Sequence, residues 1–483
     1  MRIVSQAVPS GNDTPYERGL QEAQRGLARA VAAQLAAAVP FAEREHAMLA
    51  AANEVCRRLL ESMLQATAEA HPDRVRVEGL EYARHHEGTV PYHSLCGPLT
   101  VRRATYREVG EHNGPTIVPL ELAAGLIEGA TPALAYRVAL GYAQGPGRHT
   151  EEQMHADHRQ PPSRSTLERL AKAIGTAVTR TAPRIEPLVR EAERLPAGAR
   201  GVSVGIDRTT VPMEEARPVG TPPDTRRQRR TAPYVRAVPP RVDVKYRMAY
   251  VGTVSVVDAA GEALVTRRYA IPGGDDPADL VTRLMADVRR ARAQAPRLRV
   301  GVIQDAAPEL WTLMRDGLTT EAQLRQWEEG IDRYHLNERL AEILRITEPD
   351  ATRRTPQLAR WNDALDQENV AIDRIARWVA EQLSAHEGDD LATLERHWTF
   401  LCNNNDRMRY ATLRAKGLPC GSGATEGACK SVVMIRAKGC GQRWHHEGVS
   451  AVLTLRAAYL SERLPAMWPH FADDYSAAIQ AAA

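Results

Sequence analysis

The spacing of apolar residues divides the chain into helical and β-rich stretches. From 15 to 70, apolar positions such as Val31 and Leu35 recur every three to four residues, which predicts long helices. Residues 86–108 alternate between apolar and polar positions, which predicts a hairpin with one basic edge. Helical spacing returns between 119 and 180, in pieces that Gly and Pro separate.

Beyond Pro196 the apolar period changes to two, and the chain becomes mainly β-rich. The predicted elements are strands at 201–207, 244–257 and 262–271, a helix at 276–294 and a strand at 299–305. The first and the fourth of these strands each end in an aspartate, Asp207 and Asp305. With a further helix after the fourth strand, the order β-β-β-α-β-α is that of the ribonuclease H-like fold.

The second half of the chain is predicted to be mostly helical. Residues 331–336 are expected to form a short fifth strand, and 337–415 to form helices. We interpret Trp361, Trp378 and Trp398 as core residues of this helical insertion, rather than as platforms for DNA bases.

The composition is that of a globular protein, with 43% hydrophobic residues, 25% charged residues and a net charge of +3. A length of 483 residues favours two to four domains. Six cysteines without a Cys-x-x-Cys pair argue against a zinc ribbon and against a disulfide framework. Because the sequence shows neither a signal segment nor a membrane-length apolar run, we expect a cytoplasmic, nucleoid-associated protein without a membrane partner.

Positive charge is concentrated between 217 and 247, where nine Lys or Arg accompany two Asp, a local net charge of +7. Several prolines lie among them, which is typical of an extended loop able to lie along phosphates. The arginines that we expect to contact DNA are Arg226, Arg227, Arg229 and Arg230. The alternative is an insertion whose arginines only keep it solvated.

Small polar residues mark the starts of three helices that precede the β-rich part. Thr131 and Thr150 are predicted N-caps, and Ser163 or Ser165 is predicted to cap a helix beginning near Arg164. A short helix, a turn and a second helix of this kind resemble a helix-turn-helix, whose second helix enters the major groove. Arg164 is therefore a candidate DNA-binding residue, and a helical bundle without a DNA-binding role is the alternative.

The segment 419–444 places one carboxylate, Glu426, near the start of a predicted helix and among cations. Helical spacing puts Lys430 and Val433 on the face of Glu426, and Ile435 on the side that faces the sheet. Taken alone, such a glutamate is more typical of a surface acid that balances the helix dipole. The two strand-end aspartates favour a catalytic role instead.

Moving a DNA strand requires one oxygen to displace another at phosphorus. Two divalent cations about 4 Å apart can activate the attacking oxygen and stabilise the leaving one, and Mg²⁺ or Mn²⁺ prefers carboxylate ligands. Asp207 and Asp305 lie at strand ends, where α/β sheets usually bind ligands. Together with Glu426 they are the predicted catalytic and metal-binding residues, for two Mg²⁺ or Mn²⁺ ions.

The same segment supplies a predicted DNA-binding surface. Its members are Lys430, Arg436, Lys438, Arg443 and Trp444. Lys430 lies one turn after Glu426 on the same predicted helix. Arg436, Lys438 and Arg443 extend the basic surface past Gly439, the expected glycine at the C-terminus of that helix. Trp444 is interpreted either as a platform for an unpaired base or as a packed residue.

Other residues compete for the catalytic roles. Asp332 with His335 is an alternative to Asp305, unless Asp332 only caps the following helix. We prefer Asp305 because its strand is longer and more apolar. Glu447 is an alternative third acid. Residues that we interpret as surface or packing residues are Glu214, Glu215, Cys429, His445 and His446.

In these residues the chain resembles the bacterial insertion-sequence DDE transposases, in particular the ISKra-type group. The matching motifs are Gly205-Ile206-Asp207, Gln304-Asp305, Asp332-Arg333-Tyr334-His335-Leu336 and, above all, the segment 421–444. Within that segment Gly-Ser-Gly, Thr-Glu, Cys-Lys, Arg-x-Lys-Gly and Arg-Trp fall where the family has them. The hairpin matches the family element Gly-Pro-x-x-Val-x-Arg-Arg-x-x-Tyr, but it lacks the paired cysteines that follow this element in family members.

The resemblance implies a Mg²⁺-dependent transposase that cuts the ends of its element and joins them to target DNA. It assigns Asp207, Asp305 and Glu426 to the catalytic triad. Double-stranded DNA is the expected partner, and two ends to be joined imply a homodimer or a higher oligomer. The alternatives are a nuclease on the same fold and a transposase-derived DNA-binding repressor.

The expected fold class is multidomain α/β: a ribonuclease H-like mixed sheet with an all-helical insertion, preceded by a mainly helical N-terminal DNA-binding region. The expected parts are a helical N-terminal region (1–85), a hairpin and helix-turn-helix-like DNA-binding region (86–195), the first part of the catalytic core with the basic loop 214–243 (196–336), the helical insertion (337–415), the second part of the core (416–465) and a C-terminal tail (466–483).

Overall fold

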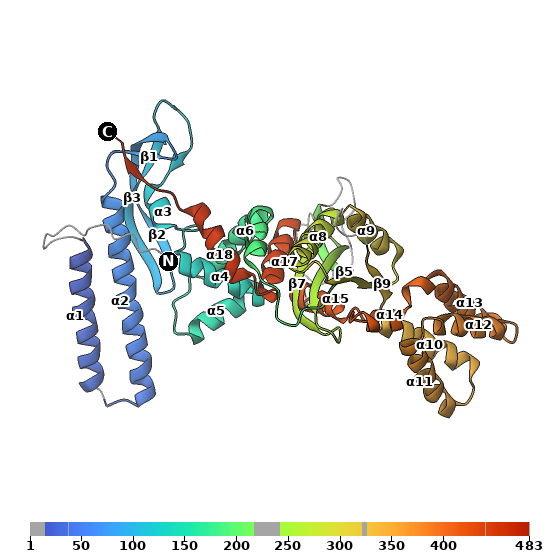
Figure 1. Cartoon of the computed structure of the whole chain (residues 1–483). Coiled ribbons are helices and arrows are strands. Elements are labelled where there is room, and N and C mark those ends of the chain that lie inside the picture. Colours follow the sequence, from blue (N-terminus) through green and yellow to red (C-terminus); the bar gives the residue numbers. More distant parts are fainter. Residues whose placement is uncertain (1–14, 37, 217–241, 321–325, 440, 483) are drawn as a thin grey trace, which may run out of the picture. The chain divides into compact units, whose positions relative to one another are not determined.

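The computed structural model describes residues 15–36, 38–216, 242–320, 326–439 and 441–482 (Figure 1). These residues form two compact units. The first unit runs to Ile185 and resumes at Leu464, and the second is Glu186–Arg463. The multidomain α/β class is confirmed, and in the described residues no helix has the length and apolar character to span a membrane.

The first unit combines helices with a five-stranded antiparallel sheet of order β10-β1-β2-β3-β4. The long helices predicted at its start are α1 (Pro15–Ala36) and α2 (Phe41–Glu69). Its strands are β1 (Arg74–Val77), β2 (Leu80–Ser94), β3 (Gly97–Glu108), β4 (Thr116–Ile117) and β10 (Gln480–Ala481). The predicted hairpin is confirmed as β2 and β3, which are longer than expected and close with Ser94 opposite Gly97.

Two expected domain boundaries fall inside elements of this unit. The boundary at 85/86 lies within β2, and the one at 465/466 lies within α18 (Leu464–Ala472). A change from helical to β-rich sequence marks a new element here and not a new core, because Leu64 of α2 shares one apolar cluster with Leu99 of β3. The expected tail is also part of the unit, since β10 pairs with β1.

Four more helices follow the sheet in the chain. They are α3 (Pro119–Ala124), α4 (Pro132–Gln144), α5 (Gly147–Ala156) and α6 (Arg164–Ala192). Ser163 caps α6, since its Oγ accepts the N–H of Thr166, but the side chain of Thr131 makes no capping hydrogen bond to α4. The prediction that Thr150 is an N-cap is wrong. Thr150 lies inside α5, where it is buried against Gly141 of α4.

The second unit is built on a mixed five-stranded sheet of order β7-β6-β5-β8-β9. Its strands are β5 (Gly201–Ala216), β6 (Val242–Val257), β7 (Ala263–Ile271), β8 (Arg299–Gln304) and β9 (Glu328–Ile331). The first three pair antiparallel, whereas β8 pairs parallel with both β5 and β9. The prediction of a strand at 331–336 is wrong beyond Ile331, where the fifth strand ends, because Asp332 caps a helix that begins at Arg333.

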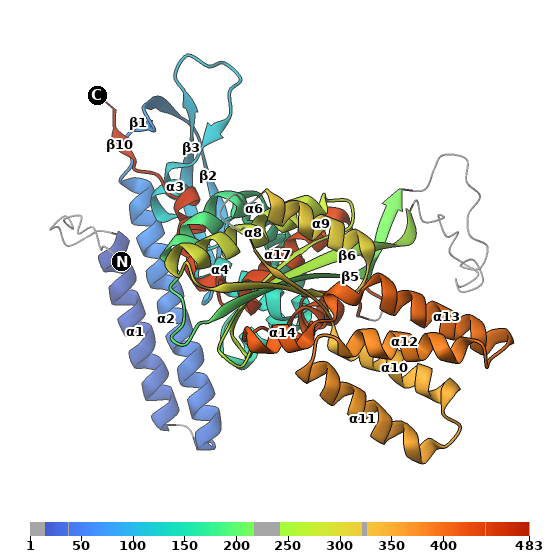
Figure 2. The ribbon, with the colours of Figure 1, turned by 45° about the vertical axis from the view of Figure 1, so that its right-hand side comes forward.

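The strand β5 is longer than predicted. Asp207 lies in its middle, opposite Val251 of β6, so the expectation that this strand ends at Asp207 is wrong. The pairing of β5 with β6 continues to Ala216, whereas β8 pairs with β5 only as far as Val204. The far halves of β5 and β6 therefore form a two-stranded ribbon (Figure 2).

Alternating residues of the sheet face two layers of helices, as a period of two requires. Val204 and Ile206 of β5 share a core with α8 (Pro277–Gln294) and α9 (Pro308–Thr319). On the opposite face, Val211 and Met213 of β5 share a core with α17 (His446–Leu460) and the helical segment that carries Glu426. Asp207 lies an even number of residues from Val211 and Met213 on β5, so it is on the same face of the sheet as these two residues.

The segment 337–415, predicted to be helical, is mostly helical in the structure. Its α-helices are α10 (Arg333–Thr347), α11 (Ala351–Gln367), α12 (Ala371–Leu383), α13 (Gly388–Asn403) and α14 (Tyr410–Ala415). Trp361 is buried and meets Trp378 edge-on at 5.1 Å between ring centroids. Trp398 is 36% exposed, so its interpretation as a core residue is wrong.

Candidate active site

Glu426 lies in α15 (Gly423–Ala428), which continues into a π-helical turn, η2 (Cys429–Met434), and the short α16 (Ile435–Ala437). The predicted faces of this segment are wrong from Val433 on. Val433 is fully buried and Ile435 is 67% exposed, the reverse of the α-helical expectation. A π-helical turn contains an extra residue, so it rotates the following side chains relative to α-helical spacing.

Glycine at 205 allows α15 to lie close to the sheet. A Cβ at this position would lie 2.8 Å from Oγ1 of Thr425 and closer still to the carbonyl oxygen of Ile303. Thr425 is in turn fixed by Thr253 of β6, whose Oγ1 is 2.6 Å from its own. These contacts set the position of the residue that follows, Glu426, over β5 and β6.

Asp332, His335 and Glu426 converge on one point. Among the described residues, they form the group of three whose potential metal-ligand atoms all lie within 4.8 Å of one another. Asp332 is buried, whereas His335 and Glu426 are both partly exposed. The structure therefore brings the alternative pair Asp332 and His335, rather than Asp207 and Asp305, closest to Glu426.

Ser422 links Asp332 to Glu426. Oδ1 of Asp332 accepts the N–H of His335 at 3.0 Å, which confirms its predicted role as the cap of α10. Its Oδ2 accepts the backbone N–H of Ser422 and lies 2.9 Å from Oγ of Ser422, which is 2.7 Å from Oε1 of Glu426. A hydroxyl has one proton, so Ser422 donates to one of the two carboxylates at a time.

His335 faces several carboxylates. Its Nε2 lies 3.6 Å from Oε1 of Glu426, and its Nδ1 lies 3.2 Å from Oε2 of Glu338. Partial burial lowers the pKa of His335, but the hydrogen bond to Glu338 and the fields of Asp305, Asp332 and Glu426 together outweigh burial and raise it. A larger fraction of this imidazole is therefore charged near neutral pH.

Asp207 and Asp305 lie at the same level of neighbouring strands. Val204 of β5 pairs with Val302 of β8, and extending this register by three residues on each strand reaches Asp207 and Asp305. Asp305 is exposed and follows the last residue of β8, as predicted, and its Oδ1 accepts the N–H of Ala306 at 2.6 Å. The neighbouring Gln304 is fully buried and accepts the N–H of Ile206.

Cys429 connects Asp207 to the same region. Burial raises the pKa of the Cys429 thiol, and a hydrogen bond to Asp207 and the charge of Glu426 raise it further. The thiol is thus kept protonated, which agrees with its interpretation as a packing residue. Asp207 and Glu426 both raise the pKa of Cys429, and Asp305 and Glu426 both raise the pKa of His335.

The predicted DNA-binding residues near this site have different surroundings. Lys430 and Arg443 are exposed, and Nζ of Lys438 lies 3.2 Å from Oγ1 of Thr209. Arg436 is only 3% exposed and lies 5.3 Å from the ring centroid of Trp444, so the expectation that it extends an exposed basic surface is wrong. The burial follows from the π-helical turn, which rotates Arg436 inward.

Trp444 is held by the β5–β6 ribbon and by the preceding helix. Its backbone forms a bridge with Met213, and its Nε1 donates to the carbonyl of Ala437 at 3.0 Å. Of the two interpretations, these contacts favour the packed residue. Arg226, Arg227, Arg229 and Arg230 lie outside the described residues. Arg164 is exposed at the start of α6 and pairs with Glu151 at 2.8 Å.

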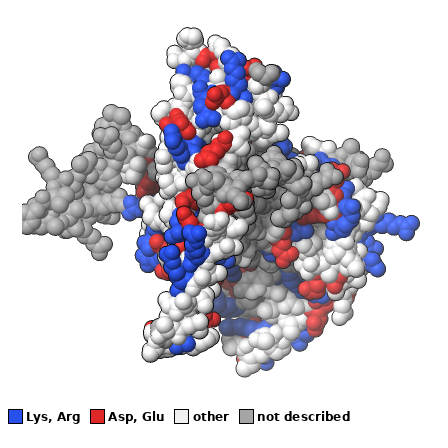
Figure 3. Space-filling view, turned by 90° about the vertical axis from the view of Figure 1, so that its left-hand side faces the viewer, with Lys and Arg blue, Asp and Glu red and all other residues white. Residues whose placement is uncertain are grey.

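The remaining alternative residues lie in separate ion pairs or at a helix start. Glu214 pairs with His445 at 3.3 Å, and His446 pairs with Asp275 at 2.8 Å. Glu215 pairs with Arg247, as a surface role predicts. Glu447 is exposed in the first turn of α17. On the face drawn in Figure 3, Lys and Arg are interspersed with Asp and Glu.

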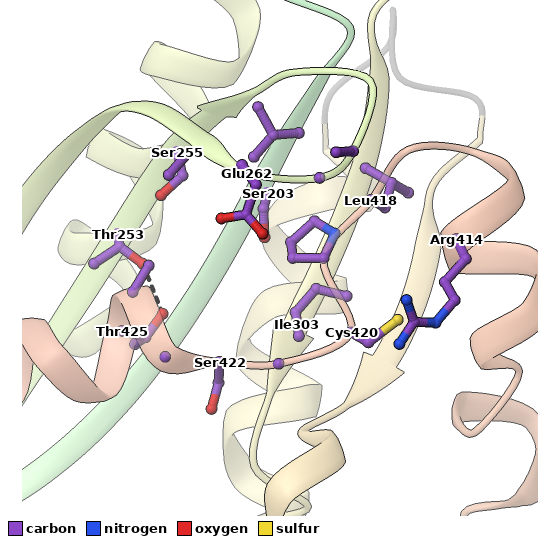
Figure 4. A pocket seen from close by; sticks show the side chains of 18 residues that line it. Ser203, Thr253, Ser255, Glu262, Ile303, Arg414, Leu418, Cys420, Ser422 and Thr425 are labelled. Atoms are coloured by element: carbon purple, nitrogen blue, oxygen red, sulfur yellow. Dashed lines mark hydrogen bonds between the residues drawn. The ribbon is translucent and has the colours of Figure 1, made fainter. Parts of the chain in front are cut away.

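A pocket of about 360 Å³ lies behind the segment that precedes Glu426 (Figure 4). Ser203, Thr253 and Ser255 of the sheet line one side, and Ser422 and Thr425 line another. Glu262 and Arg414 also line it, and its other polar side chains are mainly hydroxyls.

No protein-family model matches the chain, and no curated protein matches it significantly. The sequence analysis missed the part played by Ser422, although its place in the Gly-Ser-Gly motif four residues before Glu426 was a usable signal. A serine at that spacing, just before a helix, can reach the side chain of the residue one turn later.

Proposed function

We propose that the chain is a DDE transposase of an insertion sequence, which cuts the ends of its element and joins them to target DNA. The observation that carries this proposal is the placement of two acids on neighbouring strands of one mixed sheet and of a third on a helix that packs against that sheet. Asp207 and Asp305 stand level on neighbouring parallel strands, and Glu426 enters from a helix packed over β5 and β6. Acids from three distant parts of the chain are what strand transfer at phosphorus requires.

The strand order supports a ribonuclease H-like core. Three antiparallel strands are followed by two that run parallel to the first, and the acids belong to the first and fourth strands. The insertion formed by α10 to α14 accounts for the long separation between the fifth strand and Glu426.

The donor set fits divalent cations. Asp207, Asp305 and Glu426 offer carboxylate oxygens, the ligands that Mg²⁺ and Mn²⁺ prefer, and Asp305 is open to solvent. When bound, such ions activate the attacking oxygen and stabilise the leaving one.

The chain's own residues would orient the acids and the DNA. Asp332 and Ser422 fix the start of α15 and so the direction of Glu426. The exposed Lys430 and Arg443 would contact phosphates. His335, whose pKa is raised, offers a charged N–H donor beside Glu426.

A nuclease on the same fold is the second candidate, because the site would cut DNA equally well without joining it. A joining assay separates the two. The full chain is incubated with labelled DNA carrying the inverted repeats that flank its coding region, a plasmid target and Mg²⁺. Products in which labelled ends are joined to the plasmid support the transposase. Cleavage without joining would indicate the nuclease, and binding without cleavage a repressor. Products in which both ends of one element are joined to the same plasmid would further indicate a homodimer or a higher oligomer.

A further inference from the structure

Two cysteines of the first unit lie where a helix meets the end of a hairpin. Cys56 belongs to α2, and Cys96 belongs to the turn between β2 and β3, 96 − 56 = 40 positions further along the chain. Both are free thiols in the structure. Cys56 is exposed, whereas Cys96 is only 6% exposed. An oxidant in solution can therefore reach the first sulfur more easily than the second.

The residue after Cys56 holds α2 against the hairpin turn. Nη1 of Arg57 donates to the carbonyl of Pro98 at 3.3 Å. A Cβ at Gly97 would lie 3.4 Å from Cδ of Arg57, so the helix and the turn are in close contact here. The residue that follows Cys56 thus contacts the two residues that follow Cys96, which places both cysteines at the same junction.

The segment that follows α5 contacts both partners of this junction. The carbonyl of His158 accepts a hydrogen bond from Nδ2 of Asn53, which lies three residues before Cys56 on α2. The N–H of Gln160 donates to the carbonyl of Leu95, in the hairpin turn, at 3.1 Å. Helix, turn and segment therefore meet around the two cysteines, and their hydrogen bonds fix the backbone on each side.

The two thiols also interact directly. The thiol of Cys96 is hydrogen-bonded to that of Cys56, and the guanidinium of Arg159 acts on it as well. Burial and the neighbouring Cys56 raise the pKa of Cys96, whereas Arg159 lowers it. Cys96 is therefore held as a thiol in the reduced protein, while Arg159 supplies a positive charge that stabilises its thiolate once the proton is lost.

We propose that Cys56 and Cys96 form a redox-active pair, which a small disulfide such as glutathione disulfide converts into an intramolecular disulfide bond. The proposal concerns the first unit and does not depend on the proposed function. It also differs from the disulfide framework against which the cysteine spacing argues, because both thiols are free in the structure and the bond forms only on exposure to the oxidant. The bond would cross-link α2 to the hairpin turn.

The reaction consists of two thiol–disulfide exchanges. The thiol of Cys56 loses its proton to solvent, and its sulfur attacks one sulfur of glutathione disulfide. A mixed disulfide forms, the S–S bond of the oxidant breaks, and one glutathione leaves as a thiolate that takes up a proton. The sulfur of Cys96, after losing its own proton, then attacks Sγ of Cys56 and releases the second glutathione. Two protein thiols are oxidised, and one glutathione disulfide is reduced to two thiols.

The test treats the full chain with glutathione disulfide at about pH 8, where cysteine thiols are partly ionised. The monomer band of a non-reducing gel is digested with trypsin and analysed by mass spectrometry. We expect a pair of peptides linked through Cys56 and Cys96, without glutathione on either, and we expect dithiothreitol to separate them. In Cys96→Ser the mixed disulfide has no second thiol to release it, so Cys56 should retain one glutathione.

Cys402 is the matched control, because it is also an exposed free thiol but lies on α13 of the second unit. It should retain glutathione both in the unchanged protein and in Cys96→Ser. If Cys96→Ser loses its fold, judged by circular dichroism, Cys96→Ala replaces it. The proposal is overturned if Cys56 of the unchanged protein retains glutathione to the same extent as Cys402. It is equally overturned if Cys402 is modified while Cys56 and Cys96 both stay reduced.

Discussion

Oδ2 of Asp332 lies 2.9 Å from Oγ of Ser422, although 90 positions separate the two residues. Asp332 caps α10, the first helix of the insertion, and Ser422 precedes α15. The contact therefore joins the beginning of the insertion to the segment that follows its end. Since Ser422 also reaches Glu426, its hydroxyl, together with the imidazole of His335, orients that carboxylate.

Ser422→Ala should weaken metal use without weakening DNA binding. Glu426 keeps its place in the chain but loses the hydroxyl that orients it, and changes of this kind typically cost about 10–100-fold in metal affinity or activity. Cleavage rates measured against Mg²⁺ concentration would reveal this as a higher Mg²⁺ requirement. Ser431→Ala is the matched control, because that hydroxyl lies 3.5 Å from the carbonyl oxygen of Ala428, within its own helical segment. Equal Mg²⁺ curves for both variants would argue against the positioning role of Ser422.

Asp305→Asn and Asp332→Asn should have opposite effects. If Asp305 is the second metal ligand, its amide should reduce cleavage to background while the protein keeps its stability, because the side chain is exposed. Asp332 is buried and accepts hydrogen bonds from His335 and Ser422, so Asp332→Asn should cost about 1–3 kcal/mol of unfolding free energy and leave measurable cleavage. Urea unfolding and a cleavage assay test both. The reverse pattern would transfer the metal-binding role to Asp332.

Glu426→Gln should abolish cleavage while DNA binding stays within a few-fold of the unchanged protein. The amide has nearly the shape of the carboxylate but cannot supply its charge to a divalent cation. Glu447→Gln serves as the control, since Glu447 was the alternative third acid and is exposed at the start of α17. If cleavage survives Glu426→Gln and disappears with Glu447→Gln, Glu447 and not Glu426 is the third acid of the site.

Gly205→Ala should displace α15 from the sheet. The new methyl group would collide with the carbonyl of Ile303 and with Thr425, at a cost of about 1–3 kcal/mol. Because Thr425 precedes Glu426, cleavage should fall as well. Gly427→Ala, where a Cβ meets nothing within 4 Å, should keep or increase stability by up to about 1 kcal/mol. A Gly205→Ala protein as stable as the unchanged one would contradict this account of the contact.

His397 should make the second unit less stable in mild acid. Burial lowers the pKa of His397, with Arg339 and Arg396 acting in the same direction and Glu342 opposing them. A folded pKa below the unfolded value means that its contribution is present above the unfolded pKa and is lost as pH falls through the folded one. Urea midpoints at about pH 7.5 and about pH 5.5 should therefore fall less in His397→Gln than in the unchanged protein. Equal falls would exclude His397 as a cause.

Local signals predicted much of the second unit. The turn after Val257 and the apolar runs at β6, β7 and β8 led to the correct strand order, and Asp305 lies at its strand end as expected. The length of β5 was underestimated, because Asp207 interrupts the apolar run while the ribbon beyond it is stabilised by Met213 and its contact with Trp444. Such support comes from a distant segment that no local pattern reveals.

The candidate site was predicted only in part. Glu426, Asp207 and Asp305 were predicted from their places beside strands and at a helix start, but of these only Glu426 lies in the cluster with Asp332 and His335, because that cluster depends on tertiary contacts. The bond between Asp332 and Ser422 spans the whole insertion, and the π-helical turn at Cys429 has no signature in the periodicity. For that reason the orientation of Arg436 and Ile435 was predicted wrongly.

The pairing of β1 with β10 also determines the order in which the chain can become native during synthesis. Glu186–Arg463 is synthesised entirely before α18 and β10, so every strand of its sheet is made while the sheet of the first unit still lacks one. The first unit, although begun earlier, must wait with an open sheet edge for residues 480 and 481. A chain that ends before them would therefore contain all the strands of the second sheet and leave the first sheet unfinished.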